Sequence, residues 1–174
     1  GILSYEPDAD EFNIGQSTTH NNMAISIDND DNTTIKNLKI RKFSVTGSTV
    51  GEYSGDVVYF GGTTSMTKGA LYHYKSDGTW ELADADAAST CDGLLAISLN
   101  TASDTHGMLL RGMITLDHDP GAVGDVLFAS TTAGDITATA PSGSGDIVRV
   151  VGYCLHASQG SIYFNPDGTF VEVA

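Results

Sequence analysis

The sequence places one histidine between two carboxylates, at Asp117, His118 and Asp119, immediately before Pro120. Nearby carboxylates raise the proton affinity of an imidazole, so these residues could serve as a general base or as metal ligands. On a strand, however, successive side chains point to opposite faces, and three consecutive ones do not easily converge. We therefore interpret residues 117–120 as a polar loop, and we name no catalytic residue.

A second group of oxygen-bearing side chains occupies residues 28–32, which read Asp-Asn-Asp-Asp-Asn. Carboxylate and amide oxygens are the ligands that calcium prefers, but an EF-hand loop also needs a glycine and a distant glutamate, and neither is in place. We interpret this stretch as a solvated acidic turn, with a cation site as the alternative. The five histidines show no metal-ligand spacing to one another or to the two cysteines. We therefore predict no metal and no cofactor.

Three aromatic residues form the third candidate site. Tyr72, Tyr74 and Trp80 flank Ser76-Asp77-Gly78, and Asp-Gly between strand-forming residues is the strongest short-range hairpin signal. Aromatic rings beside a hairpin tip could stack on a sugar, although such rings more often form core contacts or cross-strand pairs. We name Tyr72, Tyr74 and Trp80 as the candidate ligand-binding residues.

The sequence lacks the signatures of common enzyme classes. It contains no phosphate-binding loop of the Gly-x-x-x-x-Gly-Lys-Ser/Thr type and no Gly-x-Ser-x-Gly elbow. Gly143-Ser144-Gly145 precedes an expected strand and not a helix, which argues against a dinucleotide site. A glycoside hydrolase needs two carboxylates across the scissile bond. The sequence contains 22 acidic residues, and their number does not identify which two would form such a pair. We expect a non-enzymatic protein, with a glycan-degrading enzyme as the least favoured alternative.

Short strands dominate the expected secondary structure. Helical periodicity is nearly absent, and residues 82–88 offer only a short turn that reads more like a loop. Short runs rich in Val, Ile, Tyr, Phe and Thr alternate with Gly, Asp and Asn, which is typical of a sandwich or barrel. Gly-Asp precedes an apolar strand three times, and there the two residues would shape a turn. These Gly-Asp pairs lie at residues 55–56, 124–125 and 145–146.

The chain divides by composition near residue 47. Residues 3–5 and 12–14 read as a hairpin around Pro7-Asp8, and the stretch up to residue 46 is too short and too simply alternating to hold a large core alone. This stretch also carries four of the eight Lys and Arg residues. We predict an all-β protein, with an N-terminal β-rich shaft or oligomerisation segment over residues 1–46. A compact antiparallel β-barrel or sandwich head domain is expected over residues 47–174.

The 174 residues carry a formal net charge of −14, with 8 Lys and Arg against 22 Asp and Glu. This balance repels nucleic-acid phosphates and anionic membrane surfaces, so we expect no nucleic-acid partner. No run is long enough to span a membrane and no signal sequence opens the chain, so we expect no membrane insertion. Because the first residue is Gly1, we expect the visible end of a longer chain or a processed product.

The order of motifs from Gly55 to Val173 resembles the C-terminal head domain of bacteriophage tail fibres and related virion structural proteins. Residues 3–15 resemble the repeat-like hairpins that lead into such heads. Phage capsid decoration proteins have a similar pattern of short strands and glycines, so that class of protein stays an alternative. The motifs that carry the resemblance are GDVVY at 55–59, GLLA at 93–96, MLLRG at 108–112, STTAG at 130–134, TATAP at 137–141, GDIVRVVG at 145–152 and IYFNP at 162–166.

The resemblance implies a homotrimer with an intertwined N-terminal segment and a compact head that faces the host. The implied partners are other copies of the chain, other virion tail or capsid proteins, and a host-surface glycan or protein receptor. The implied location is the virion, after synthesis in the host cytoplasm. The alternatives are a capsid decoration (cement) protein, an extracellular filament subunit that donates a strand to the next copy, and a glycan-degrading tailspike.

Overall fold

The computed structural model describes residues 44 and 48–174 in full, together with the backbone of residues 2–6, 11–15, 25–27 and 33–35. Contacts divide the chain into two units, residues 1–41 and residues 42–174. The predicted domain boundary, between residues 46 and 47, lies among residues outside the described part. It stays a prediction.

The first unit contains a four-stranded antiparallel sheet. Its strands are β1 (Ile2–Glu6), β2 (Glu11–Gly15), β3 (Ile25–Ile27) and β4 (Thr33–Ile35). They are ordered β1-β2-β3-β4, and Leu3 of β1 lies opposite Ile14 of β2. The predicted Pro7-Asp8 turn and the acidic residues 28–32 lie outside the described residues. The turn and the alternative cation site therefore stay predictions.

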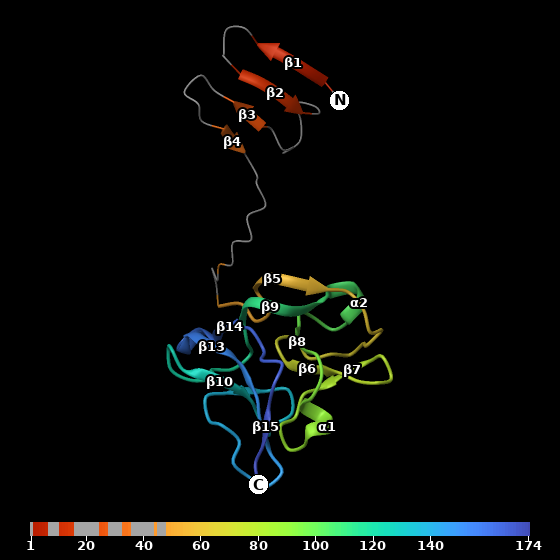
Figure 1. Cartoon of the computed structure of the whole chain (residues 1–174), viewed down its shortest axis with the longest axis vertical. Helices are drawn as coiled ribbons and strands as arrows, with labels where there is room; N and C mark the ends of the chain where they lie inside the picture. Colours follow the sequence, from red (N-terminus) through yellow and green to blue (C-terminus); the bar gives the residue numbers. More distant parts are fainter. Residues whose placement is uncertain (1, 7–10, 16–24, 28–32, 36–43, 45–47) are drawn as a thin grey trace. The chain divides into compact units, whose positions relative to one another are not determined.

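The second unit is an antiparallel sheet curled into a half-barrel (Figure 1). Its strands are β5 (Tyr53–Val58), β6 (Leu71–Tyr74), β7 (Trp80–Leu82), β8 (Leu95–Ser98), β9 (Met108–Thr115), β10 (Val126–Ala129), β11 (Ile136–Thr137), β12 (Ile147–Val148), β13 (Val150–His156), β14 (Ser161–Phe164) and β15 (Val171–Glu172). The sheet runs β11-β10-β13-β14-β9-β8-β6-β7, with β5 paired to β9 and a separate β12–β15 pair. The prediction of an all-β antiparallel protein is confirmed, and a half-barrel stands in place of the predicted barrel or sandwich.

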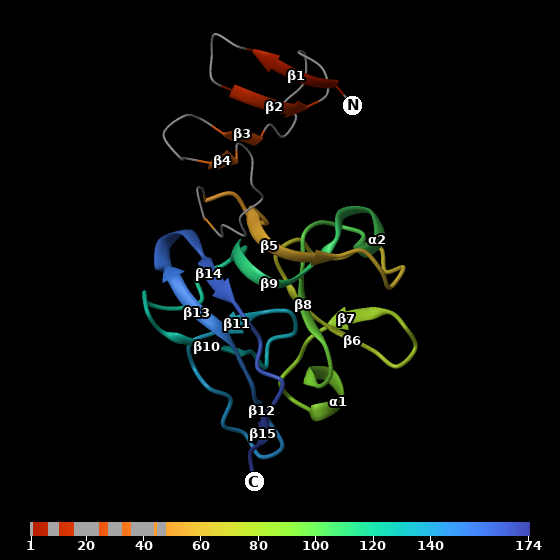
Figure 2. The same cartoon turned by 45° about the horizontal axis from the view of Figure 1, so that its top comes forward.

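Short helical segments connect some of these strands. They are α1 (Ala88–Cys91), α2 (Ser103–His106) and the 3-10 turn Ala157–Gln159. Helix α1 begins where the ambiguous stretch 82–88 ends, so most of that stretch is loop, in agreement with the preferred interpretation. Figure 2 shows the β6–β7 hairpin between α2 and α1.

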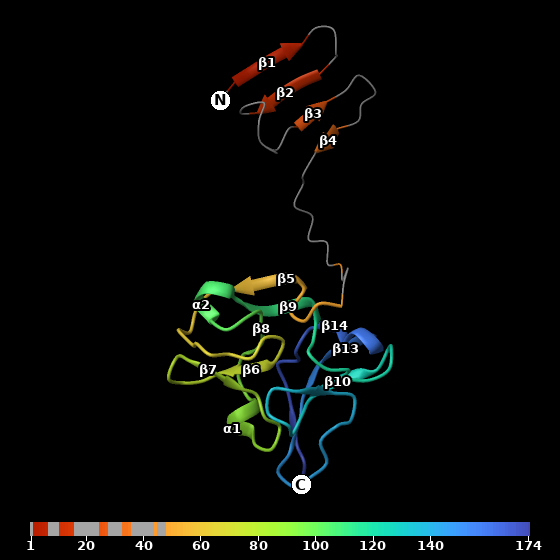
Figure 3. The same cartoon turned by 180° about the vertical axis from the view of Figure 1, so that it is seen from behind.

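Strand β9 belongs to both halves of the curled sheet, and β5 pairs along one of its edges. Leu109 of β9 pairs with Ile97 of β8 and also with Val57 of β5, so β5 and β8 lie on opposite edges of β9. Farther along β9, residues 112–115 pair with β14. In Figures 1 and 3, β6, β7 and β8 accordingly lie to one side, and β10, β13 and β14 lie to the other. Strand β9 therefore ties the halves together.

Two glycines meet within this β5–β9 pair. Gly55 lies directly opposite Gly112, next to a shift in the pairing register. A Cβ atom on Gly55 would overlap the Arg111 carbonyl oxygen, and one on Gly112 would overlap the Ser54 carbonyl oxygen. Only glycine permits this close approach of two backbones. The prediction of a turn at Gly55-Asp56 is therefore wrong, because both residues lie inside β5.

Three connections of the second unit use the same turn. In each, an aspartate N–H donates to the carbonyl oxygen three residues earlier, at 3.0 Å. The preceding glycine has a φ of 87° to 90°, as the third residue of a type II turn requires. The turns end at Asp125, Asp135 and Asp146, and strands β10, β11 and β12 follow them. The predicted turns at residues 124–125 and 145–146 are confirmed, and Gly134-Asp135 adds a third.

The interior of this unit contains two clusters of buried side chains. The larger one fills the curl of the sheet and includes Leu71, Leu95, Ile97, Leu109, Ile114, Leu127, Ile136, Ile147, Val151, Ile162 and Phe164. The smaller one contains Met66, Ala70, Tyr72, Trp80, Ala96 and Met108. Burial of side chains of this size typically contributes roughly 1.5–3 kcal/mol each. The smaller cluster supports the surface feature discussed below.

A buried arginine joins three separate segments. Arg149 is 4% exposed, and its guanidinium donates hydrogen bonds to three backbone carbonyl oxygens. The acceptors are Cys91 at 2.7 Å, Gly93 at 2.8 Å and Asp167 at 2.9 Å. Burial lowers the pKa of the Arg149 guanidinium below its usual value. The side chain thus connects the end of α1 and the C-terminal turn to the sheet.

Both cysteines are free and buried. Burial raises the pKa of the Cys91 thiol from 9.0 to about 11. Because the folded-state pKa lies above the unfolded-state value, the unfolded state releases this proton first as the pH rises. We therefore expect the free energy of unfolding to be unaffected by Cys91 below pH 9.0 and to fall between pH 9.0 and about 11.

Urea unfolding at a series of pH values, followed through the fluorescence of the single tryptophan, measures this effect. A Cys91→Ala variant should lose less stability across the alkaline range than the wild type loses. Parallel pH profiles for the two proteins would contradict the assignment to Cys91.

Candidate ligand groove

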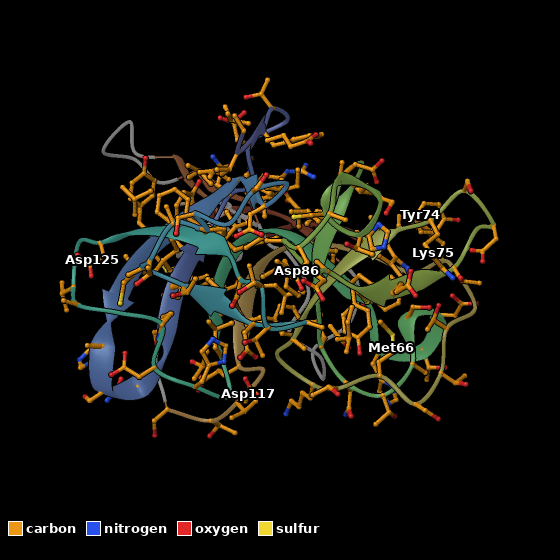
Figure 4. All side chains as sticks on the ribbon, turned by 90° about the horizontal axis from the view of Figure 1, so that it is seen from below. Met66, Tyr74, Lys75, Asp86, Asp117 and Asp125 are labelled. Atoms are coloured by element: carbon orange, nitrogen blue, oxygen red, sulfur yellow. The ribbon has the colours of Figure 1, made fainter. Side chains whose placement is uncertain are left out.

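An open groove of about 460 Å³ lies beside the β6–β7 hairpin. Its lining includes residues 63–67, in the connection from β5 to β6, which we call the wall, together with Glu81, Asp84 and Thr90. Hydroxyl and carboxylate groups therefore dominate its polar lining. Figure 4 shows Met66 and Tyr74 on the same side of the unit, far from Asp125.

Two aromatic residues hold the wall of the groove in place. The Trp80 indole N–H donates to the Phe60 carbonyl oxygen at 2.9 Å, and its backbone N–H donates to the Thr63 hydroxyl at 2.8 Å. The Tyr72 hydroxyl accepts a hydrogen bond from the Thr67 backbone N–H at 2.8 Å. Both ends of residues 60–67 are thus fixed to the hairpin.

Helix α2 holds the same loop from the other side. The Ser103 backbone N–H donates to the Thr63 carbonyl oxygen at 3.0 Å, and the Ser103 hydroxyl accepts from the Thr63 N–H at 3.1 Å. The Asp104 carboxylate accepts a hydrogen bond from the Gly62 N–H at 2.9 Å. With its backbone polar groups satisfied in this way, the wall presents its side chains in fixed positions.

The three predicted ligand-binding residues occupy different places. Tyr72 and Trp80 line the groove, but only 5% and 3% of their surfaces are exposed. Tyr74 lies outside the lining and packs against Trp80, with ring centroids 4.9 Å apart, and edge-on against Phe60 at 5.0 Å. The structure thus brings all three near one site, where the two lining rings form its floor. Ligand binding by these residues stays a prediction.

Three hydroxyl groups of the wall are not used by the fold. Among the described residues, no hydrogen bond engages the side chains of Thr64, Ser65 or Thr67. The Glu81 side chain is 50% exposed and lies 3.4 Å from the His73 ring nitrogen, while one Asp84 oxygen accepts from the Asp86 N–H at 3.0 Å. These side chains leave donors and acceptors that a bound molecule could use.

The surroundings of the groove are electronegative. The pKa of Asp86 is raised above its usual value, mainly by the neighbouring Asp84 carboxylate. The lining contains no Lys or Arg among the described residues. Lys75, on the adjacent hairpin, is paired with Asp77 at 3.0 Å.

One residue of the wall has an unusual backbone. Ser65 has a φ of 60° and is the one non-glycine residue at positive φ in the described part of the chain. A β-branched side chain is strongly disfavoured in this conformation, whereas glycine adopts it freely. We expect Ser65→Val to lower the free energy of unfolding by about 1–2 kcal/mol, and Ser65→Gly to change it by less than about 1 kcal/mol.

Urea unfolding of the two variants beside the wild type measures the difference. Because the Ser65 side chain is exposed, both substitutions act mainly through the backbone. Equal stability of the valine and glycine variants would show that the left-handed conformation is not maintained in solution.

The sequence analysis identified Tyr72 and Trp80 but missed the hydroxyl-bearing wall. Its signal in the sequence is Gly61-Gly62 followed by three consecutive hydroxyl residues, Thr63-Thr64-Ser65. Such a run could indicate a surface loop, but not that it faces Glu81 and Asp84. That proximity arises only through the hairpin and the bonds of Trp80.

The Asp117-His118-Asp119 sequence lies in a loop after β9, as predicted, next to a smaller cavity of about 250 Å³. The His118 Nδ1 atom is 2.7 Å from an Asp117 carboxylate oxygen, and its Nε2 atom is 2.9 Å from the Ile136 carbonyl oxygen. Asp117 and His118 meet here because a loop lacks the alternation of a strand, while the Asp119 carboxylate accepts a hydrogen bond from the Gly121 N–H at 3.2 Å. The pair attaches the loop to β11.

Within the described residues, no group of three or more His, Cys, Asp or Glu side chains is arranged to hold a metal ion. No helix in that part of the chain has the length and apolar character needed to cross a membrane. No family model, no curated protein and no solved structure matches the chain. The groove and its surroundings are therefore the basis for a functional proposal.

Proposed function

We propose that the chain is a structural protein of a virus particle, namely the head of a phage tail fibre or similar appendage that attaches to the host surface. The order of motifs between Gly55 and Val173 supports the virion assignment. The observation that carries the attachment role is the groove, whose polar wall is fixed to a rigid sheet. A preorganised surface of this kind suits recognition, because little ordering is needed on binding.

In this proposal three copies assemble through residues 1–46, and residues 47–174 form the heads. The partners are the other copies, further tail or capsid proteins, and a glycan or protein receptor on the host. The protein acts in the virion and is made in the host cytoplasm. A closed assembly would bury apolar positions of the N-terminal segment, which is too short to hold a large core alone.

Two measurements on the full chain test the proposal. Light scattering should give a mass three times the 18.2 kDa of one chain. Fluorescently labelled protein should bind the surface of some strains in a panel of bacterial cells. A single-chain mass would overturn the trimer, and binding to empty capsids but to no cells would replace attachment by capsid decoration.

A further inference from the structure

The hydroxyl and carboxylate groups that line the groove define what it can bind. Thr64, Ser65 and Thr67 offer hydroxyls that both donate and accept, whereas Glu81 and Asp84 offer carboxylate oxygens that only accept. A matching ligand must therefore bring several donors to the carboxylates and mixed groups to the hydroxyls. A chain of sugar hydroxyls has this composition.

Charge narrows the class of ligand further. Glu81 and Asp84 carry negative charge into the lining, and Asp86 lies close enough for Asp84 to raise its pKa. A carboxylate, sulfate or phosphate on the ligand would face these groups without a lysine or arginine from the described lining. Like charges at short range cost several kcal/mol in an interface, roughly enough to exclude an acidic ligand.

The buried rings at the floor of the groove limit which interactions can contribute to binding affinity. Tyr72 and Trp80 are 5% and 3% exposed, so neither ring offers a face broad enough for stacking. Their polar groups are engaged by Thr67 and Phe60, respectively. Specificity must then come from hydrogen bonds to the wall and to the two carboxylates, and charge-assisted bonds are the stronger of these.

From these observations we infer that the groove binds an uncharged, polyhydroxylated ligand, a neutral glycan, through Glu81, Asp84 and the hydroxyls of residues 64–67, and that it rejects acidic glycans. This inference rests on the proposed attachment function and specifies its ligand. It assigns a direct contact to three hydroxyls that the fold does not use and to two carboxylates that each use one oxygen in the fold.

An array of neutral and acidic bacterial surface polysaccharides, probed with the full chain, tests the inference. Binding should be confined to neutral members. The double variant Glu81→Gln/Asp84→Asn should lose binding roughly tenfold or more, since it removes two charge-assisted acceptors while keeping side-chain shape. The ratio of its binding to acidic polysaccharides over its binding to neutral ones should rise. Binding of acidic polysaccharides by the wild type, binding of a lysine-rich peptide in place of glycans, or no binding to any member would overturn the inference.

A matched control carries the same change of charge at two positions outside the lining of the groove. Asp92→Asn/Glu172→Gln removes one aspartate and one glutamate charge at exposed positions outside the lining, and it should bind as the wild type does. An unchanged Trp80 fluorescence spectrum verifies that the groove of each variant is intact. An equal loss in both double variants would show that net charge, and not the groove, governs binding, and this would also overturn the inference.

Cell binding separates this inference from the function on which it rests. If the wild type binds cells and Glu81→Gln/Asp84→Asn binds them equally well, the groove is not the receptor site and the attachment role remains. If the wild type binds no cells, the attachment role itself fails. The two failures are therefore distinguishable in one set of samples.

Discussion

Replacing Arg149 by methionine is expected to lower the free energy of unfolding by about 3 kcal/mol or more. Methionine fills similar space but offers no donor to the carbonyl oxygens of Cys91, Gly93 and Asp167. A buried acceptor without a partner costs roughly 1–3 kcal/mol, and hydrogen bonds to a charged donor are among the stronger ones. Because Arg149 is 4% exposed, water does not readily replace the lost bonds.

Chemical unfolding of the full chain, followed by tryptophan fluorescence, measures this loss for the second unit, in which Trp80 lies. Arg111→Met is the matched control. The Arg111 side chain is 44% exposed and lies 3.5 Å from the Asp56 carboxylate, an exposed pair of the kind that contributes about 1 kcal/mol or less. Similar losses in the two variants would show that the carbonyl contacts of Arg149 are not formed in solution.

Adding a single methyl group at Gly55 is expected to destabilise the second unit by at least about 3 kcal/mol. The new Cβ would overlap the Arg111 carbonyl oxygen and crowd the Gly112 Cα, and these are backbone atoms of the paired strand that no side-chain rotation can move aside. Relief requires that β5 and β9 separate. Both halves of the sheet pair with β9, so the loss should appear as one cooperative change.

Gly168→Ala provides the comparison for Gly55→Ala. A Cβ at Gly168 meets no atom within 4 Å, so this substitution should change stability by less than about 0.5 kcal/mol. Thermal and urea unfolding of both variants decides the question. Wild-type stability of Gly55→Ala would mean that the two glycines do not meet.

The sequence predicted well those structural features that depend on residues close together along the chain. The Asp77-Gly78 hairpin was expected because turn residues and alternating strands are local, and β6 and β7 pair around it. Two of the three Gly-Asp turns were found from the same local chemistry.

Features that depend on distant segments were missed. Gly55 was assigned to a turn because its role depends on Gly112, which only the folded sheet places opposite it. Arg149 gave no signal because its acceptors are backbone carbonyls, which carry no residue identity. Only part of the groove was predicted. Tyr72 and Trp80 were identified because they belong to the predicted hairpin. Its wall and the Asp84 carboxylate come from elsewhere in the chain.

The three repeated turns affect which surface positions of the second unit tolerate substitution. Each turn closes through its own backbone hydrogen bond and its own glycine, so the second residue of each turn takes no part in closing it. These residues, Val123, Ala133 and Ser144, are all exposed. They are places where a new side chain can be introduced without rebuilding the sheet. Since Ala133 lines the groove, one substitution there would change the shape and chemistry of the groove while leaving the scaffold unaltered.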